Sequence, residues 1–482
     1  MASLKTNVLL NYINTFTSIA FPVITFPYAT RVLLLDGIGL ANFYGSLVNY
    51  ITLFSGIGIQ MYAAKEVARH RDNVYQRNKC TAEIAVLGLL FCVLGYVAVA
   101  LMGLFVPRIH AHLDLFLVLS LSIFFTVIGV DWFYRAIEDF TFITVRAVLF
   151  RALAAVSLFV FVRSSDDLLA YCLVTVSLSV GNNFINFIHL RKYISLRTIP
   201  WRELNVWRHL PRTLKIFIPN LVTNMYGHLN IAMLGFMQSA AIVGLYSAGS
   251  KLVLIALSVI NSLSIVLLPR SSNLIETGHY ADFASISLKA VRLVILLSLP
   301  GLALMALLAP QIVVACCGGA FAPSSIVVAC TAPALLIVGL SNIIGIQVLY
   351  SQGREKIVIG SMLAGVALNV ILNLALIPSH QYMGAALSML LSETFVLIVQ
   401  LVVGRKYIPF RLRDLGLGRY LTATLLLALA VIMVTASVDG VWFSLIAGVL
   451  LGGGVYVLSL YFMRDTLFGE VLHYTTSMFR RR

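Results

Sequence analysis

The chain has 482 residues, of which 60% are apolar and 11% are charged, with a mean hydropathy of +0.96 and a formal net charge of +15. Soluble globular proteins have about 45–50% apolar and about 25% charged residues, so this composition excludes a soluble enzyme and a nucleic-acid-binding domain. A membrane helix needs about 20 apolar residues. The apolar content is enough for about fourteen such helices, which also excludes a single-pass receptor.

Long segments with few charges follow one another along the chain, and each is long enough to cross a bilayer as a helix. The first six are 6–30, 37–64, 84–107, 115–138, 142–162 and 168–190. After a basic segment come 216–237 and 242–269. A stretch without charge then runs between Arg292 and Arg354, and prolines and glycines at 309–323 divide it into two spans. The last four are 357–377, 383–404, 420–438 and 442–463. We therefore expect an all-α polytopic membrane protein with about fourteen transmembrane helices.

Positive charge is concentrated in alternate loops. Basic residues follow the second, sixth and twelfth spans and end the chain, whereas loops of the other parity carry mostly acids such as Asp36, Asp114 and Asp439. Lys and Arg are enriched in cytoplasmic loops. With an even number of spans, both termini are expected on the cytoplasmic side. Most of the net charge of +15 is then a topology signal rather than a sign of an acidic partner.

A faint internal repeat relates the two halves of the chain. Pro22 and Pro219 occupy equivalent places, "GLANFYGS" (39–46) resembles "IVGLYSAG" (242–249), and Tyr134 corresponds to Tyr350. Parallel repeats in transporters usually enclose a central site. The expected organisation is a six-helix lobe at 1–195, a basic cytoplasmic linker at 196–212, a second six-helix lobe at 213–408, and two additional helices with a basic tail at 409–482.

Three blocks of the sequence resemble the Wzx-type flippases of lipid-linked polysaccharide repeat units, in the multidrug/oligosaccharidyl-lipid/polysaccharide (MOP) exporter superfamily. They are the opening "NYINTFTSIAFPVITFPYATRVL" with "GIGLANFYGSLVNYITLFSGIGIQMYAAKEVA", then "DWFYRAIEDFTFITVRA" (131–147), and "QVLYSQGREKIVIGSMLAGVALNVILNLALIPSHQYMGAALSMLLSE" (347–393). The resemblance covers essentially the whole chain, in order. It implies a MATE-like core of twelve helices in two lobes, with two added helices at the C-terminus.

The resemblance also implies a function. Such a protein moves undecaprenyl-pyrophosphate-linked oligosaccharide units from the cytoplasmic to the periplasmic leaflet of a bacterial inner membrane, by alternating access, for O-antigen or capsular polysaccharide assembly. Its expected partners are that lipid, the surrounding membrane lipids, a polysaccharide polymerase and a chain-length regulator, and we expect a monomer. Two alternatives stay open: a multidrug or metabolite cation antiporter of the same superfamily, and a lipid II flippase.

Charged side chains inside the spans are the best candidates for a substrate site, because each costs about 2.5–3.5 kcal/mol at the bilayer centre. Lys251 lies roughly 13 Å deep, at about 1.5 Å per residue, and a cation there suits an anionic pyrophosphate. The other candidate cations are Arg31, Arg146, Arg151 and Arg292. The alternative for each is an ion pair with a neighbouring helix, or a side chain that extends to the membrane interface.

A second set of residues is a candidate for ion coupling, polar networks or hinges. It contains Glu393 near the midplane, Asp131, which can also pair with Arg135 four residues later, and the amides Asn220, Asn224, Asn369 and Asn373, with Pro22, Pro27 and Pro219 as hinges. Coupling to H⁺ or Na⁺ is the expected role of the acids. We expect no cofactor, no metal and no nucleic acid. The sequence has no GxxxxGK[ST] loop, and its loops are too short for a catalytic domain, which predicts a transporter rather than an enzyme.

Overall fold

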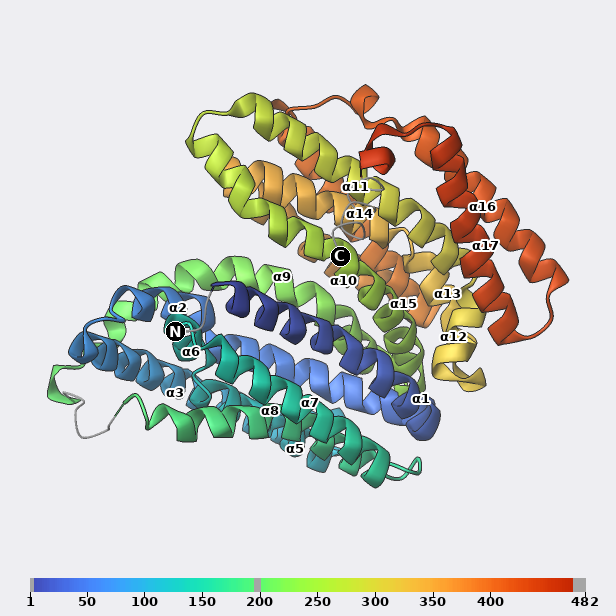
Figure 1. Cartoon of the computed structure of the whole chain (residues 1–482). Coiled ribbons are helices and arrows are strands. Elements are labelled where there is room, and N and C mark those ends of the chain that lie inside the picture. The colour runs from blue at the N-terminus through green and yellow to red at the C-terminus, as the bar shows by residue number, and fades with distance from the viewer. Residues whose placement is uncertain (1–3, 195–200, 471–482) are drawn as a thin grey trace. The chain divides into compact units, whose positions relative to one another are not determined.

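The computed structural model describes residues 4–194 and 201–470, without the side chains of 4–9, 11, 218–220, 222–226, 262–266 and 412. Every regular element among these residues is a helix (Figure 1). By packing, the chain divides into two compact units, 1–244 and 245–482, so that α9 belongs with the first unit. The predicted lobes and the linker at 196–212 stay a prediction. They rest on the internal repeat and on membrane topology, whereas the two units rest on packing.

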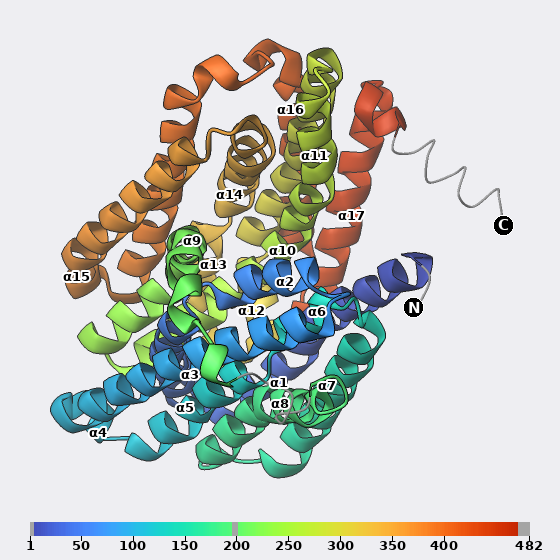
Figure 2. The ribbon, with the colours of Figure 1, turned by 90° about the vertical axis from the view of Figure 1, so that its left-hand side faces the viewer.

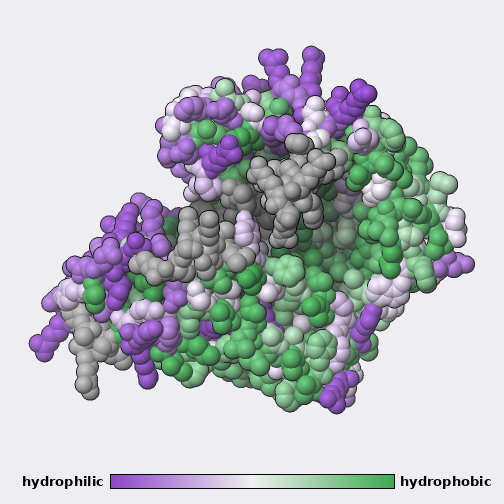
Figure 3. Space-filling model, viewed as in Figure 1, coloured by the Kyte–Doolittle hydropathy of each residue, from purple (hydrophilic) through white to green (hydrophobic). Residues whose placement is uncertain are grey.

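Unit 1 is built from nine α-helices and two short 3₁₀ turns within the described residues. These elements are α1 (Leu4–Gly56), α2 (Ile59–Arg69), α3 (Val74–Phe105), α4 (Pro107–His110), α5 (Leu113–Ile128), α6 (Asp131–Ala136), α7 (Phe140–Phe161), α8 (Leu168–Leu190), η2 (Trp201–Glu203), η3 (Val206–His209) and α9 (Leu210–Met237). In Figure 3, hydrophilic residues of this unit gather at the end formed by α2 and α3, and hydrophobic residues cover much of its flank.

Unit 2 begins inside α10 and is also helical throughout its described residues. Its elements are α10 (Ala240–Glu276), α11 (Tyr280–Leu307), α12 (Ala309–Cys317), η4 (Gly319–Phe321), α13 (Ser324–Thr331), α14 (Ala334–Asn342), the π-helix η5 (Ile343–Leu349), η6 (Tyr350–Gln352), α15 (Glu355–Val403), η7 (Arg405–Tyr407), η8 (Leu412–Leu415), α16 (Leu417–Ser437) and α17 (Val441–Phe462). The helices α16 and α17 pack against each other and against α11; they lie side by side in Figure 1, and Figure 2 shows α11 in front of α16.

The number of spans agrees with the expectation. Eleven helices of the described chain are long and apolar enough to cross a bilayer. Two of them, Tyr12–Arg69 and Glu355–Val403, are long enough to cross twice, and each contains a residue with non-helical backbone, Leu34 or Gln381. Dividing these two gives thirteen spans, and the 28-residue α9 makes fourteen. The predicted all-α polytopic fold is confirmed.

The prolines predicted as hinges do not break the first span. Pro22 and Pro27 lie within α1, and the non-helical residue of that element is Leu34, at the turn between the first and second spans. Pro219 lies in a part of α9 whose side chains are outside the described residues. Whether these helices bend during transport stays a prediction.

The segments of the predicted repeat meet at two glycines within unit 1. A Cβ on Gly39 of α1 would lie 1.8 Å from the carbonyl oxygen of Ala240, and a Cβ on Gly244 would lie 2.2 Å from that of Leu35. Small residues allow such close backbone approach between membrane helices. The two glycines are therefore required by the packing of α1 against the start of α10.

Replacing Gly39 by alanine is expected to lower the free energy of unfolding by about 1–3 kcal/mol, because the added methyl group meets backbone rather than a movable side chain. The matched control is Gly45→Ala on the same helix, where a Cβ meets nothing within 4 Å. Alanine there is expected to be neutral or stabilising by up to about 1 kcal/mol. Thermal unfolding of the purified variants in detergent measures both, and equal midpoints would contradict this account of the contact.

Candidate functional site

Asp131, which is half-buried, forms an ion pair in unit 1 with the buried Arg146. The Asp131 carboxylate accepts from Arg146 Nη2 at 3.0 Å and from Arg135 Nε at 2.9 Å. The side chain of Arg146 is 5% exposed, whereas that of Arg135 is 60% exposed. The Arg146 guanidinium also lies over the Phe142 ring, 5.3 Å from its centroid. Asp131 thus makes the expected pair with Arg135, and the structure adds Arg146 to it.

The hydrogen-bonding capacity of Arg146 is only partly used. Its Nε and Nη1 atoms are buried and have no hydrogen-bond partner among the described residues. Leaving such donors unpaired costs about 1–3 kcal/mol each, and more for charged groups. Arg146 lines a cavity of about 430 Å³ between α7 and α8, whose other polar lining includes His189 and Lys192. Of the predicted cations, Arg146 is therefore one with donors left for a ligand.

Two other predicted arginines have partners within their own units. Arg151 Nη1 donates to the Asn14 side chain at 2.9 Å and to Thr17 Oγ1 at 2.7 Å, which fastens α7 to α1. In unit 2, Arg292 Nη2 lies 3.1 Å from the buried Asp465 carboxylate, in the segment after α17. These contacts match the alternative of pairing with a neighbouring segment. A substrate role for either arginine stays a prediction.

The other predicted residues differ in their exposure and their contacts, and their roles stay predictions. Arg31 is exposed on α1, while Lys251 in α10 and Glu393 in α15 are each half-buried within unit 2. Asn369 and Asn373 of α15 are both buried, and Asn373 Nδ2 donates to Asn369 Oδ1 at 3.0 Å, so the predicted one-face spacing does bring them together. Asn220 and Asn224 lie in the part of α9 whose side chains are outside the described residues.

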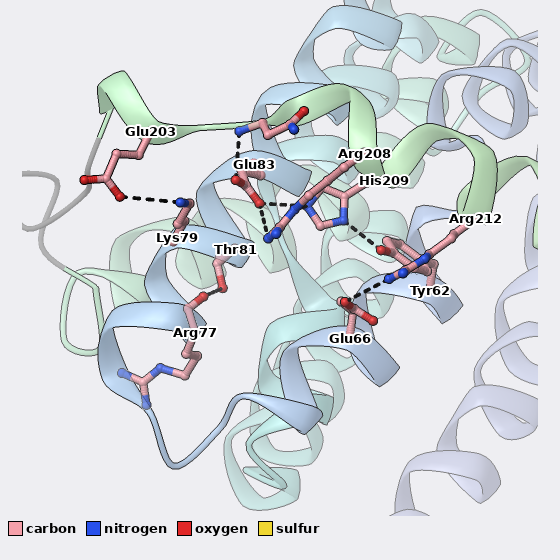
Figure 4. Close-up of polar contacts among 11 residues, drawn as sticks. Tyr62, Glu66, Arg77, Lys79, Thr81, Glu83, Glu203, Arg208, His209 and Arg212 are labelled. Atoms are coloured by element: carbon pink, nitrogen blue, oxygen red, sulfur yellow. Dashed lines mark hydrogen bonds and ion pairs between the residues drawn. The ribbon is translucent and has the colours of Figure 1, made fainter.

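A buried polar cluster around Glu83 was not among the predicted sites (Figure 4). The Glu83 side chain is completely buried in α3, and it accepts from the Asn205 backbone N–H at 2.8 Å. Arg208 Nη2 lies 2.5 Å and His209 Nε2 lies 2.8 Å from its carboxylate. His209 Nδ1 lies 2.7 Å from the Tyr62 hydroxyl of α2. These contacts hold η3, directly before α9, against α2 and α3.

The charge state of His209 follows from this geometry. Burial lowers the pKa of His209 below its ordinary value, although the Glu83 carboxylate opposes the effect. Nε2 of His209 lies 2.8 Å from the Glu83 carboxylate and 3.2 Å from Arg208 Nε, and Nδ1 lies 2.7 Å from the Tyr62 hydroxyl, so both ring nitrogens have partners. Arg208 then supplies the positive charge that neutralises Glu83.

A second carboxylate extends the same cluster. Glu66 of α2 accepts from Arg69 at 3.2 Å and from Arg212, in the first turn of α9, at 3.3 Å. In the sequence, the arginines of the linker indicate topology alone. The signal that could have pointed to the cluster is the presence of Glu66 and Glu83 on either side of a basic loop, where positive charge otherwise dominates. No group of three or more His, Cys, Asp or Glu suited to a metal ion occurs among the described residues.

Comparisons with known proteins agree on a family and on a fold. Residues 4–275 match the family described as polysaccharide biosynthesis protein. A protein of Escherichia coli (strain K12) named as a candidate O-antigen transporter is 22% identical over 84% of this chain and 97% of its own length. A protein of the same name from Shigella dysenteriae is 21% identical over 83% of this chain and 99% of its own length.

Two solved structures share the fold. The lipid II flippase MurJ, in an inward closed conformation, matches with a TM-score of 0.78 at 14% identity, over 95% of this chain and 99% of its own. A multidrug resistance MATE family transporter of the MOP superfamily, in an inward-facing conformation, matches with a TM-score of 0.64 at 14% identity, over 82% of this chain and 94% of its own. At this identity the likeness concerns the fold alone.

Proposed function

We propose that this chain, which belongs to the polysaccharide biosynthesis protein family and shares the fold of a MOP-superfamily transporter, flips undecaprenyl-pyrophosphate-linked oligosaccharide repeat units across the membrane. The proposed direction is from the cytoplasmic to the periplasmic leaflet, by alternating access, for the assembly of O-antigen or capsular polysaccharide. The names of the relatives from Escherichia coli and Shigella dysenteriae support an O-antigen substrate.

The observation that best supports an anionic substrate is the environment of Arg146, which is buried and keeps unused hydrogen-bond donors. A pyrophosphate cannot cross about 30 Å of hydrocarbon unaided, so its carrier must offer positive charge and hydrogen-bond donors inside the membrane. Arg146 is 6% exposed, lies in a helix apolar enough to span the bilayer, and keeps two donors without a partner among the described residues. A guanidinium is well suited to phosphate oxygens because it donates in a planar fork.

The rest of the proposal concerns coupling, location and partners. Transport is coupled to H⁺ or Na⁺ through Glu393 or Asp131, and Lys251 and Arg31 contact the pyrophosphate along the path. The protein is a monomer in the bacterial inner membrane with both termini in the cytoplasm, and it works with a polysaccharide polymerase and a chain-length regulator. The basic loops after the second and twelfth spans support this orientation.

Two related functions are weaker candidates. A drug or metabolite cation antiporter needs acids in its cavity, whereas the predicted charges inside the spans are mainly Lys and Arg. A lipid II flippase would share both the fold and an anionic pyrophosphate substrate. A lipid II flippase differs from the proposed function in the glycan that its lipid carries. A deletion strain distinguishes the two.

Deletion of the gene is expected to abolish surface polysaccharide and to trap lipid-linked repeat units in the inner leaflet. Electrophoresis of surface polysaccharide and mass spectrometry of the lipid extract measure the two effects. The control is the same strain with the gene restored. Normal surface polysaccharide in a strain without a paralogue would refute the proposed function. Loss of cell-wall synthesis instead would favour the lipid II alternative, and drug sensitivity alone would favour the antiporter.

A further inference from the structure

The cavity between α7 and α8 has a polar end and an apolar end. Its polar lining includes Arg146 of α7, His189 near the end of α8, and Lys192 just beyond α8. Its apolar lining includes Val145, Leu149 and Ile185, which are 59%, 53% and 37% exposed. Because the first turns of α7 and the last turn of α8 lie at the predicted cytoplasmic side, the polar end faces that leaflet.

Several polar atoms at this end have unmet hydrogen-bonding capacity. Arg146 Nε and Nη1 and His189 Nδ1 are buried with no hydrogen-bond partner in the described part of the chain. The Phe142 ring holds both side chains, with the His189 ring stacked 4.0 Å from it and the Arg146 guanidinium 5.3 Å away. Buried groups of this kind are normally satisfied, so each orphan calls for an explanation such as a ligand or a water.

The charges around the cavity favour an anion. Lys192 is exposed, and its ammonium lies 5.7 Å from the Tyr193 ring centroid. Asp139, the one acid in the lining, accepts from the Phe142 backbone N–H at 3.2 Å and from the Tyr193 hydroxyl at 3.1 Å and keeps its charge, so the lining has two cations, Arg146 and Lys192, against one carboxylate. The Asp131 carboxylate pairs with both Arg146 and Arg135. Its single negative charge therefore neutralises only part of the charge of Arg146.

We propose that this cavity is the docking site for the phosphorylated head of the lipid-linked substrate on the cytoplasmic leaflet, with the first part of the prenyl chain lying along Val145, Leu149 and Ile185. The proposal rests on the proposed function for the identity of the lipid. The Lys192 ammonium meets the phosphates first, at the membrane surface. The donors of Arg146 are covered by neighbouring side chains, so they bind a phosphate oxygen after a rotation of the cavity wall, while their charge already acts at a distance in a medium of low dielectric constant.

The test is a binding measurement on the full chain in nanodiscs of phosphatidylcholine, with undecaprenyl pyrophosphate as the probe and native mass spectrometry as the readout. Lys192→Gln is expected to weaken binding about fivefold, the effect of one surface cation. Its matched control is Arg191→Gln, which removes the same charge from the adjacent residue, outside the cavity lining. Leu149→Trp is expected to weaken binding at least tenfold by filling the apolar end. Its control is Leu153→Trp, at an exposed position one turn along α7 that is not part of the lining.

Two competitors identify the bound molecule. Phosphatidylglycerol and inorganic pyrophosphate are each expected to compete at least tenfold more weakly than undecaprenyl pyrophosphate, because the first has one phosphate charge and the second has no chain. Equal competition by either would overturn the proposal, as would equal binding by Lys192→Gln and Arg191→Gln. The assay involves no transport. A chain that binds at this cavity but does not flip the lipid would refute the proposed function alone, and a chain that flips the lipid while its binding ignores both cavity variants would refute the docking site alone.

Discussion

Replacing Glu83 by alanine is expected to lower the free energy of unfolding by about 1–3 kcal/mol, because buried hydrogen-bond donors lose their acceptor. The carboxylate is completely buried and is shared by Arg208, His209 and the Asn205 backbone N–H. Its removal leaves the buried His209 ring and the Asn205 backbone N–H without their acceptor, whereas Arg208, whose side chain is 44% exposed, can be solvated by water. It also frees the contact that holds η3 to α2 and α3. Chemical unfolding of the purified protein in mixed micelles measures the change.

The matched control for this variant is Glu203→Ala. Glu203 lies in the same region and pairs with Lys79 at 3.5 Å, but its side chain is 60% exposed (Figure 4). Exposed ion pairs contribute little because water solvates both partners, so this variant is expected to unfold like the parent protein. An equal loss in both variants, or none in Glu83→Ala, would contradict a stabilising role for the cluster. Glu83→Gln, which keeps the shape and one acceptor, is expected to fall between the two.

Replacing Lys251 by alanine is expected to reduce transport at least about tenfold at an unchanged level of protein in the membrane. A charge-assisted hydrogen bond is worth about 1.5–3 kcal/mol, and an intramembrane cation is kept at a cost that only a function or a partner offsets. The measurement is recovery of surface polysaccharide when the variant is expressed in the deletion strain, with immunoblots of the membrane fraction.

Two further variants make the Lys251 result specific. Lys251→Arg keeps the charge and is expected to retain most of the activity. Lys289→Ala removes a lysine of α11 that is 52% exposed and pairs with Glu470 at 2.8 Å, and full activity is expected. Full activity of Lys251→Ala would remove this residue from the substrate path. A drop in its protein level would instead assign it a structural role.

The spans were predictable because each is decided by local physics. A segment with few charged side chains favours the bilayer, and its backbone must then hydrogen-bond within itself as a helix. The non-helical residues Leu34 and Gln381 lie between predicted spans, as this local rule requires. The helices α1 and α15, of 53 and 49 residues, each contain two spans joined at that residue. The break of the long uncharged stretch by α12 and α13 follows from its prolines and glycines.

The partners of the charged residues were less predictable. Asp131 and Arg135 are four residues apart on one helix, so their pair follows from helix geometry. Arg151 and Asn14 are separated by 137 residues, and His209 and Glu83 by 126. No periodicity in the sequence relates such positions. Hydropathy also treats every buried acid as an interruption, so Glu83 marks only the residue before the predicted span 84–107.

The sequence by itself therefore determined that this protein lies in a membrane, about where its spans lie along the chain, and which few charges lie within them. These are properties of short segments and their transfer from water to lipid. Only the tertiary structure decided which of those charges are neutralised, because an ion pair or a hydrogen bond depends on atoms brought within about 3 Å by packing. Packing pairs Arg292 with Asp465 and Arg151 with Asn14. It places Arg146 beside a cavity, with two donors that have no partner among the described residues.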